Sequence, residues 1–311
     1  MGSRHLQGIV KLSESMNIDI VEPNTEAREI AKSRLDEISF DKNKHKLVWH
    51  KSVNELTKES DLVLVATKAA GRVDLITQLL ELGHSRFFIE KMVCQSSEEY
   101  DLLLKKMKSF DAKGWINTPR RCYEPYESIR KHINNSEIIH FSVSAGNMGL
   151  GTNAIHFIDL FSWLINDYKI RLSGEFLLNK TFTNKRGKDL LEFAGTIIGH
   201  AKNESVLSLT FLPYANLPLI LNIVGKDNHI IIDETNARVF VVKGTNGLEL
   251  KFRSEYQSNL TTEIVRDILE KDNCIFPTLD DSYFIHSELF RIFNTHIKKT
   301  LNEDKRLCPI T

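Results

Sequence analysis

Short apolar runs alternate with helical stripes along the first 118 residues. The runs, several of them rich in β-branched residues, predict strands at 18–21, 47–49, 61–66, 87–89 and 115–117. Between them, apolar side chains at helical spacing predict helices at 3–15, 25–35, 71–83 and 97–108. Gly83 is expected to end the third helix, and Ser96 or Ser97 to cap the fourth. Strands alternating with helices favour a parallel sheet covered on both faces.

The pattern changes near Ser136, after which strands follow one another through short turns. Strands are predicted at 137–144, 194–201, 206–212, 219–225, 229–233, 238–242 and 248–252, and helices at 154–166, 261–271 and 280–301. Short links between successive strands imply a largely antiparallel sheet. The expected fold class is therefore α/β: a Rossmann-like doubly wound parallel sheet over residues 1–118, then an α+β domain with a largely antiparallel open sheet over residues 119–311.

Composition narrows the functional classes. The 311 residues carry 41 basic and 41 acidic side chains, and this zero net charge argues against nucleic-acid binding. The four cysteines form no metal-binding or disulfide pattern, so we expect no metal site and a reducing compartment, the cytoplasm. We also expect no membrane association, because no apolar stretch approaches the length of a bilayer span.

A glycine followed by a distant glutamate points to dinucleotide binding. Gly2 opens a predicted helix, and Glu22 closes the next strand, 20 residues later. In the nucleotide-binding pattern, an acidic residue at this spacing hydrogen-bonds the ribose 2′-hydroxyl, and its charge would repel a 2′-phosphate. The spacing therefore favours NAD over NADP, although a glutamate at a strand end is also common as a solvated surface residue.

The glycine fingerprint is incomplete in this sequence. It should follow a strand, yet Gly2 can only be the third glycine of the pattern, so the first strand and two glycines are absent. That strand normally occupies the middle of the sheet. We therefore expect either a natural start further upstream or weak cofactor binding. A cloning remnant is an alternative source of residues 1–3.

An ordered set of motifs resembles the Gfo/Idh/MocA family of NAD(P)-dependent sugar and cyclitol oxidoreductases. The set runs through Arg4-His5-Leu6, Val21-Glu22-Pro23, the strand ending at Thr67, Glu90-Lys91, Asn153 with His156, the 276–279 segment Phe-Pro-Thr-Leu, and the terminal Cys308-Pro-Ile-Thr311. The resemblance implies hydride transfer between nicotinamide and a sugar or nucleotide-sugar, with a role in surface-glycan biosynthesis as one implication. It also implies a homo-oligomer, a dimer or tetramer.

The resemblance assigns roles to individual residues. In relatives, a lysine after a parallel strand and a histidine on the first helix of the second domain meet over the nicotinamide, and Lys91 and His156 match them. A partly desolvated lysine and a histidine can both exchange protons near neutral pH. The implied substrate-binding residues are Asn153, Arg120, Arg121 and Tyr123, and the implied cofactor-binding residues are Gly2, Ser3, Arg4, His5, Glu22, Thr67, Lys68, Glu90 and Lys91.

Other interpretations stay open at this point. Lys91 is equally compatible with a surface lysine, and His156 lies in an apolar helix where a core histidine is a serious alternative. Relatives carry proline where Met92 stands, and often an acid or amide where Thr152 stands. These departures motivate a second hypothesis, a non-catalytic regulatory or sensor protein that binds NAD and sugar with the same fold. A third hypothesis is a structural partner that assembles through its open sheet.

Overall fold

The computed structural model describes residues 1–133, 137–184, 187–244, 246–304 and 306–310, so that Ser136 and Thr311 lie outside the described residues. The chain forms two compact units. The first contains Met1–Val93, Asp101–Asn117 and Glu255–Thr278, and the second contains Cys94–Tyr100, Thr118–Ser254 and Leu279–Thr311. The sequence analysis places Glu255–Thr278 in the second domain. It belongs with the first unit because helix α7 (Gln257–Lys271) packs against helix α1 (Gly2–Ile9).

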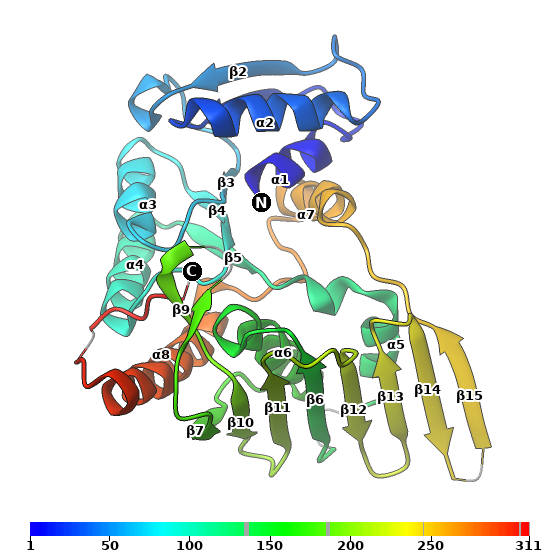
Figure 1. The fold of residues 1–311 in the computed structure, drawn as a ribbon. Coiled ribbons are helices and arrows are strands. Elements are labelled where there is room, and N and C mark those ends of the chain that lie inside the picture. The colour runs from blue at the N-terminus through cyan, green and yellow to red at the C-terminus, as the bar shows by residue number, and fades with distance from the viewer. Residues whose placement is uncertain (134–136, 185–186, 245, 305, 311) are drawn as a thin grey trace. The chain divides into compact units, whose positions relative to one another are not determined.

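The first unit holds two parallel sheets (Figure 1). Strand β1 (Asn17–Val21) pairs with β2 (Lys46–His50), and β3 (Val63–Val65), β4 (Arg86–Glu90) and β5 (Lys113–Asn117) pair in that order. Among the described residues, no strand joins β1 to β3. The sequence analysis predicts this interruption, since the first strand of a doubly wound sheet would lie there.

The helices of this unit begin and end where their capping residues lie. They are α1, α2 (Thr25–Asp36), α3 (Arg72–Glu81), α7 and most of α4 (Ser97–Ser109), with a short 3-10 turn at Val53–Glu55. Asn24 caps α2 by accepting a hydrogen bond from the backbone N–H of Ala27 at 2.9 Å. Gly83, with a φ of +95°, follows the end of α3 as predicted, because a left-handed backbone there suits glycine. Ser96 caps α4 through the N–H of Glu99, at 3.1 Å.

An apolar cluster fixes α1 within the first unit. Leu6, Val10, Ile18 and Leu35 are all buried in it, so that α1 and α2 pack with β1. Apolar side chains at helical spacing on α1 thus face the strand that follows it, as expected for a βα-type layer.

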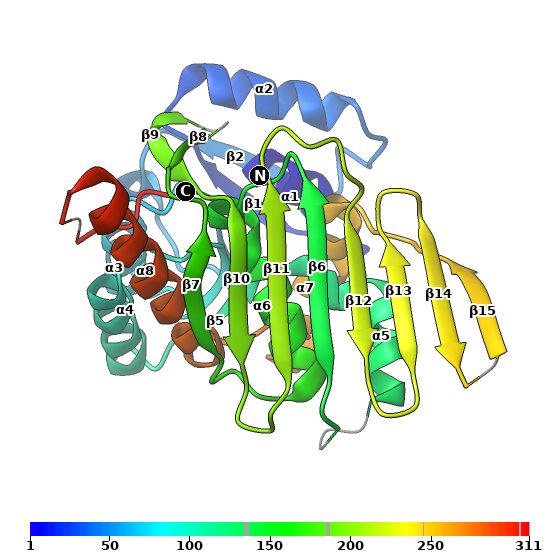
Figure 2. The same cartoon turned by 60° about the horizontal axis from the view of Figure 1, so that its bottom comes forward.

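The second unit is built on one eight-stranded sheet (Figure 2). Its strand order is β15-β14-β13-β12-β6-β11-β10-β7, and β6 with β11 is the parallel pair while the other neighbours are antiparallel. The strands are β6 (His140–Gly146), β7 (Arg171–Leu177), β10 (Gly195–His200), β11 (Val206–Leu212), β12 (Ile220–Val224), β13 (His229–Asp233), β14 (Arg238–Lys243) and β15 (Asn246–Lys251).

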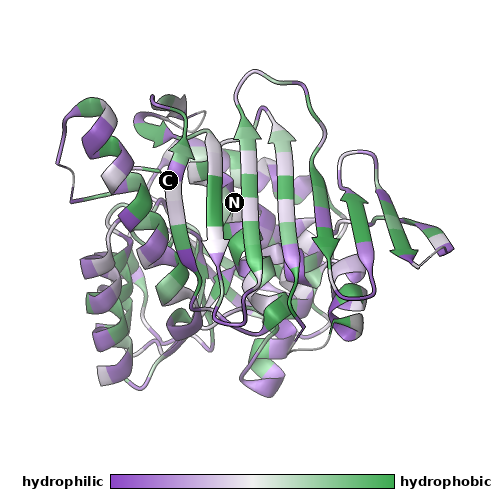
Figure 3. Cartoon of the chain, turned by 90° about the horizontal axis from the view of Figure 1, so that it is seen from below, coloured by the Kyte–Doolittle hydropathy of each residue, from purple (hydrophilic) through white to green (hydrophobic). Residues whose placement is uncertain are grey.

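Helices cover one face of this sheet. They are α5 (Glu124–His132), α6 (Leu150–Ile165) and α8 (Leu279–Leu301), and Figure 2 shows α5 and α6 behind the strands. Side chains alternate between buried and partly exposed along β11, so one face of the strand packs on α6. Figure 3 views the other face, where hydrophilic and hydrophobic positions alternate along the strands. A small hairpin of β8 (Phe182–Asn184) and β9 (Gly187–Glu192) stands apart from the main sheet.

The predicted fold class is confirmed: parallel Rossmann-like sheets are combined with a large, mostly antiparallel sheet. The sequence pattern missed α5, β7 and the β8–β9 hairpin, because each is short or only weakly periodic. None of the helices in the described part of the chain is both long and apolar enough to cross a bilayer.

Candidate active site

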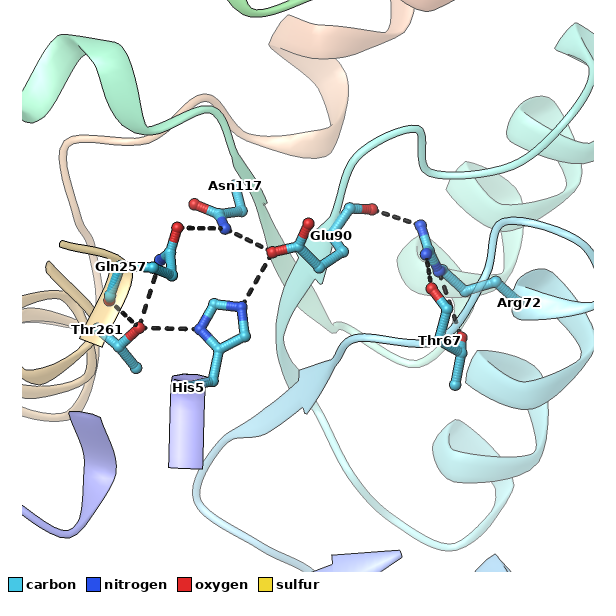
Figure 4. A network of polar contacts seen from close by, with 7 residues as sticks. All are labelled: His5, Thr67, Arg72, Glu90, Asn117, Gln257 and Thr261. Carbon is cyan, nitrogen blue, oxygen red and sulfur yellow. Dashed lines mark hydrogen bonds and ion pairs between the residues drawn. The ribbon is translucent and has the colours of Figure 1, made fainter. Parts of the chain in front are cut away.

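A buried polar network lies at the carboxyl end of β4 (Figure 4). Oε1 of Glu90 accepts a hydrogen bond from Nδ2 of Asn117 at the end of β5, and lies 2.9 Å from Nε2 of His5 on α1. Nδ1 of His5 lies 2.8 Å from Oγ1 of Thr261 on α7. Strands β4 and β5 and helix α1 therefore meet at one carboxylate, and His5 extends the network to α7.

Charge and hydrogen bonding control the ionisation of Glu90. Glu90 is only 8% exposed, and burial alone would raise the pKa of its carboxyl group. The hydrogen bonds from His5 and Asn117, together with the positive charges of His5 and Lys91, outweigh burial and lower its pKa below the ordinary value. Glu90 is therefore a buried carboxylate held in its charged form near neutral pH.

Lys91 follows Glu90 and is itself only 6% exposed. Lysine is almost never this buried unless it is paired or functional. The burial rejects the simplest alternative from the sequence, that of an ordinary surface lysine. A cation held here, at the carboxyl end of a parallel strand, stands where ligands bind in open α/β sheets.

Arg72, at the start of α3, fixes the chain on either side of Lys91. Its guanidinium donates to the backbone carbonyl oxygens of Thr67, Glu90 and Met92, and the arginine is only 1% exposed. Figure 4 shows the side chain reaching from α3 toward Thr67 and Glu90. The segment that carries Lys91 is thus tied to the end of β3 by one buried cation.

The predicted cofactor residues of the first unit lie at strand ends and at the start of α1. Glu22 directly follows β1 and is half-buried, with Oε1 accepting from the N–H of Asn24 at 3.0 Å. A Cβ added to Gly2 would lie 3.6 Å from Cβ of Ala66, so α1 begins beside the end of β3. The residues Ser3 and Arg4 are half-buried on α1, and Thr67 and Lys68 are exposed after β3.

This arrangement fits a dinucleotide. The backbone N–H groups at the start of α1 lie next to a parallel strand end, which is where a pyrophosphate binds in such folds. The Glu22 carboxylate at the end of β1 has the chemistry needed to accept hydrogen bonds from a ribose diol. His5 and Glu90, which the resemblance assigns to the cofactor, contact each other, with 2.9 Å between Nε2 and Oε1.

In the second unit, a short 3-10 turn, η2 (Pro119–Cys122), brings the two predicted arginines against α6. Nε of Arg121 donates to Oδ2 of Asp159 at 3.0 Å in a two-pronged buried ion pair. Arg120 pairs with Glu234 at 3.2 Å, and its guanidinium lies 3.9 Å from the ring centre of Phe157. Both arginines are therefore held in place by carboxylates of the second unit.

Tyr123 belongs to an aromatic cluster next to η2. Its ring stacks on Tyr126 with the centres 6.3 Å apart, and Phe252 approaches both rings edge-on. Tyr126 donates a hydrogen bond to Glu234 at 2.6 Å, and burial raises the pKa of its hydroxyl well above the ordinary value. The raised pKa makes Tyr126 a weaker acid, and its hydroxyl hydrogen is engaged by Glu234, which favours a structural role.

Asn153 and His156 lie one helical turn apart on α6, and both are half-buried. Asn153 lines a cavity of about 280 Å³ at the start of α6 and donates from Nδ2 to the carbonyl oxygen of Gly149 at 2.9 Å. His156 is not among the described residues that line this cavity. As a residue His156 is partly exposed, whereas its apolar neighbours Ile155 and Phe157 are completely buried.

Sequence reasoning missed several residues that organise these places. Arg72 and Thr261 carry no motif, and each is recognised only through long-range contacts. Glu192, at the end of β9, has no signal in the sequence beyond being an acidic residue before an apolar run. Its contacts with the start of α6 depend on a hairpin that the pattern did not predict.

No family profile and no curated protein sequence matches the chain. Solved structures do. An oxidoreductase from Agrobacterium radiobacter, crystallised with NAD+, L-tartaric acid and magnesium, is 12% identical with a TM-score of 0.71 over 93% of this chain and 91% of that one. The UDP-N-acetylglucosamine 3-dehydrogenase GnnA from Acidithiobacillus ferrooxidans is 14% identical, with a TM-score of 0.67 over 94% and 92%.

A super-repressor mutant of Gal80p from Saccharomyces cerevisiae is also similar, at 14% identity and a TM-score of 0.68 over 95% of this chain and 92% of that one. Identities this low establish a shared fold, and a fold alone does not determine function. The chain therefore has the fold that this oxidoreductase, this dehydrogenase and Gal80p have in common.

Proposed function

We propose that the chain is an NAD(P)-dependent oxidoreductase of the Gfo/Idh/MocA family, moving a hydride between nicotinamide and a hydroxyl or carbonyl carbon of a sugar or nucleotide-sugar. The observation that carries the proposal is the burial of Lys91 at the carboxyl end of β4, beside the Glu90 carboxylate. A buried cation at that strand end, in a fold shared with NAD(P)-dependent enzymes, is better explained by chemistry than by stability.

The residues proposed to hold the cofactor lie at one edge of the first unit. The start of α1, from Gly2, would bind the pyrophosphate with backbone N–H groups, and Glu22 would accept hydrogen bonds from the adenosine ribose. The carboxylate favours NAD over NADP. Bound there, the nicotinamide would supply the hydride acceptor or donor.

Lys91 is proposed to handle the proton of the reacting oxygen. A hydroxyl being oxidised must lose its proton, and a carbonyl being reduced must gain one. The ammonium group can hold the developing alkoxide and exchange its proton, and the Glu90 and Arg72 contacts keep it in position. His156 is proposed as the second proton carrier, and Asn153 as a hydrogen-bonding partner of the substrate.

Turnover tests this proposal. The wild-type chain is incubated with NAD+ or NADP+ and a panel of sugars and nucleotide-sugars, and reduction of the nicotinamide is followed by its absorbance. Loss of a positioned proton carrier is expected to lower kcat about 10²–10⁴-fold in Lys91→Ala and His156→Ala. The matched controls Lys105→Ala and His140→Ala, both at exposed positions, should keep wild-type rates. Unchanged turnover in Lys91→Ala would remove the role of Lys91.

A regulatory protein that binds the same ligands is the second candidate. The hydroxyl of Thr152, which stands where relatives often carry an acid or amide, donates to Glu192, and a Gal80p super-repressor shares the fold. Calorimetric titration with NAD+ and the same sugar panel separates the two functions. Binding without turnover favours the regulator, and turnover rejects it.

We also propose a cytoplasmic homo-oligomer, a dimer or tetramer, that uses the helix-free face of the eight-stranded sheet. Hydrophobic and hydrophilic positions alternate along the strands of this sheet (Figure 3), and apolar positions on an open sheet face favour association. Light scattering measures the assembly mass directly, and a monomeric mass at micromolar concentration would contradict this part of the proposal.

A further inference from the structure

The cavity at the start of α6 has a lining suited to a hydroxyl-rich ring. Its walls come from the loop before α6, the β8–β9 hairpin and the segment after β11. Amide and hydroxyl groups are provided by Asn147, Thr152 and Asn153, and flat aromatic faces by Phe182 and Tyr214. Pockets for small ligands combine apolar walls with a few placed polar groups in this way.

One carboxylate dominates the polar side of this cavity. Glu192 accepts hydrogen bonds from the N–H of Gly151 and, at 3.0 Å, from its neighbour Phe193. Its other oxygen accepts from the hydroxyl of Thr152 and, at 3.2 Å, from the N–H of the same residue. Glu192 therefore occupies the N-terminal end of α6 with a charge supplied by the protein itself.

The local sequence is shaped around this carboxylate. A Cβ added to Gly149 would lie 1.8 Å from Cδ of Glu192, and one added to Gly151 would lie 2.7 Å from its Oε1. Side chains at these two positions would displace the carboxylate from the helix end. Nδ2 of Asn184 donates to the Thr152 hydroxyl oxygen at 3.1 Å, so the hydroxyl is oriented with its hydrogen toward Glu192.

The position of Glu192 removes the usual preference of a helix N-terminus for an anionic ligand. Backbone N–H groups there attract anions, but these donors are already taken by Glu192. Burial raises the pKa of Glu192 above the ordinary value, by more than its hydrogen bonds lower it. A second anion brought into the cavity would meet a like charge with little water to screen it.

We propose that Glu192 is a specificity-determining residue, which makes this cavity accept a neutral, hydroxyl-bearing ring and reject the corresponding acid. A hydroxyl donates to the carboxylate, whereas a ligand carboxylate or phosphate at this place would repel it. The inference deepens the proposed function by naming the charge class of the substrate, and it rests on that function for the identification of the cavity as the substrate's.

Direct binding tests the inference without requiring turnover. The full chain is titrated, without nicotinamide, with matched pairs of one ring: D-glucose and D-glucuronate, D-galactose and D-galacturonate, UDP-glucose and UDP-glucuronate. In at least one pair the neutral member should bind about tenfold more tightly than the acid or better, which corresponds to about 1.4 kcal/mol. Glu192→Gln should bring the two affinities within about threefold of each other by removing the repulsion.

Two further variants separate charge from structure. Glu192→Asp keeps the charge while altering the contacts with the helix, so it should still reject the acids. Asp189→Asn removes an exposed carboxylate from the same strand and should leave the wild-type preference unchanged. Circular dichroism confirms that each variant is folded.

The outcomes are decisive in either direction. Preference for the neutral ring in wild type, Glu192→Asp and Asp189→Asn, with its loss in Glu192→Gln, supports the inference. It is overturned if no pair member binds, if the acid binds as tightly, or if Glu192→Gln keeps the preference. Turnover without this selectivity would support the oxidoreductase assignment and reject only the role of Glu192. Selectivity without turnover would support the role of Glu192 and reject the oxidoreductase assignment.

Discussion

Replacing Glu90 with glutamine tests whether its charge holds the base of the proposed active site together. The substitution keeps the shape and one acceptor oxygen, so the contacts with His5 and Asn117 lose charge assistance while the residue stays buried. A hydrogen bond to a charged group contributes about 1.5–3 kcal/mol, and a neutral one about 0.5–1.5. With two such bonds weakened, we expect Glu90→Gln to lower the free energy of unfolding by about 2–3 kcal/mol.

The measurement is thermal and urea unfolding across a range of pH. For a cooperative unit of this size, a loss of 2–3 kcal/mol corresponds to a fall in Tm of about 4–12 °C. The pKa of Glu90 is lower in the folded chain than its ordinary value of 4.5, so its contribution is present above pH 4.5 and is lost as pH falls through the lower folded value. The gap between wild type and Glu90→Gln should therefore be full at neutral pH and narrow in acid.

Glu81→Gln is the matched control, because it removes the same charge from an exposed position on α3. It should change Tm by less than about 2 °C, as is usual for a surface substitution. A Glu90→Gln protein as stable as wild type at neutral pH would refute the reasoning, as would a stability gap that stays constant into acid.

Three further substitutions test other parts of the structure. Arg72→Met should lower the free energy of unfolding by about 3–5 kcal/mol, measured in urea, because the buried carbonyl groups it binds lose a charged donor. Asp159→Ala should cost about 3–5 kcal/mol by leaving Arg121 buried without its carboxylate, and adding Arg121→Met should recover part of that loss. Glu22→Ala should weaken NAD+ binding, measured by calorimetry, about tenfold or more while changing NADP+ binding less. Full stability in either buried variant, or equal effects on both cofactors, would contradict the corresponding assignment.

Much of the fold could be predicted from the sequence because its strands are continuous apolar runs and most of its helices have a clear stripe. The strand at 206–212 is predicted instead from the alternation of apolar residues with Ser208 and Thr210, and its predicted bounds coincide with β11. The sequence of the α7 segment predicts a helix but does not show the partner of that helix, and the structure groups it with the first unit. The β8–β9 hairpin is short and partly polar, so its sequence has no periodicity that predicts it.

The candidate site was predictable only where chemistry follows a strand end. Glu90 and Lys91 stand out by their position after an apolar run, and their burial could be known only from the structure. The predicted arginines do lie against α6, but the carboxylates that engage them come from distant segments, Asp159 and Glu234, and no local pattern reveals those pairs. The role of a charged residue depends on long-range ion pairs of this kind, which the sequence does not show.

Isotope transfer tests the central claim most directly. Reduced nicotinamide cofactor carrying deuterium at C4 is incubated with the chain and a panel of keto-sugars and keto-nucleotide-sugars, and the carbohydrate is examined by mass spectrometry. The account predicts that deuterium enters the sugar with wild type and with Lys105→Ala, and about 10²–10⁴-fold more slowly with Lys91→Ala. A panel that acquires no deuterium from wild type, or acquires it equally fast with Lys91→Ala, would contradict it.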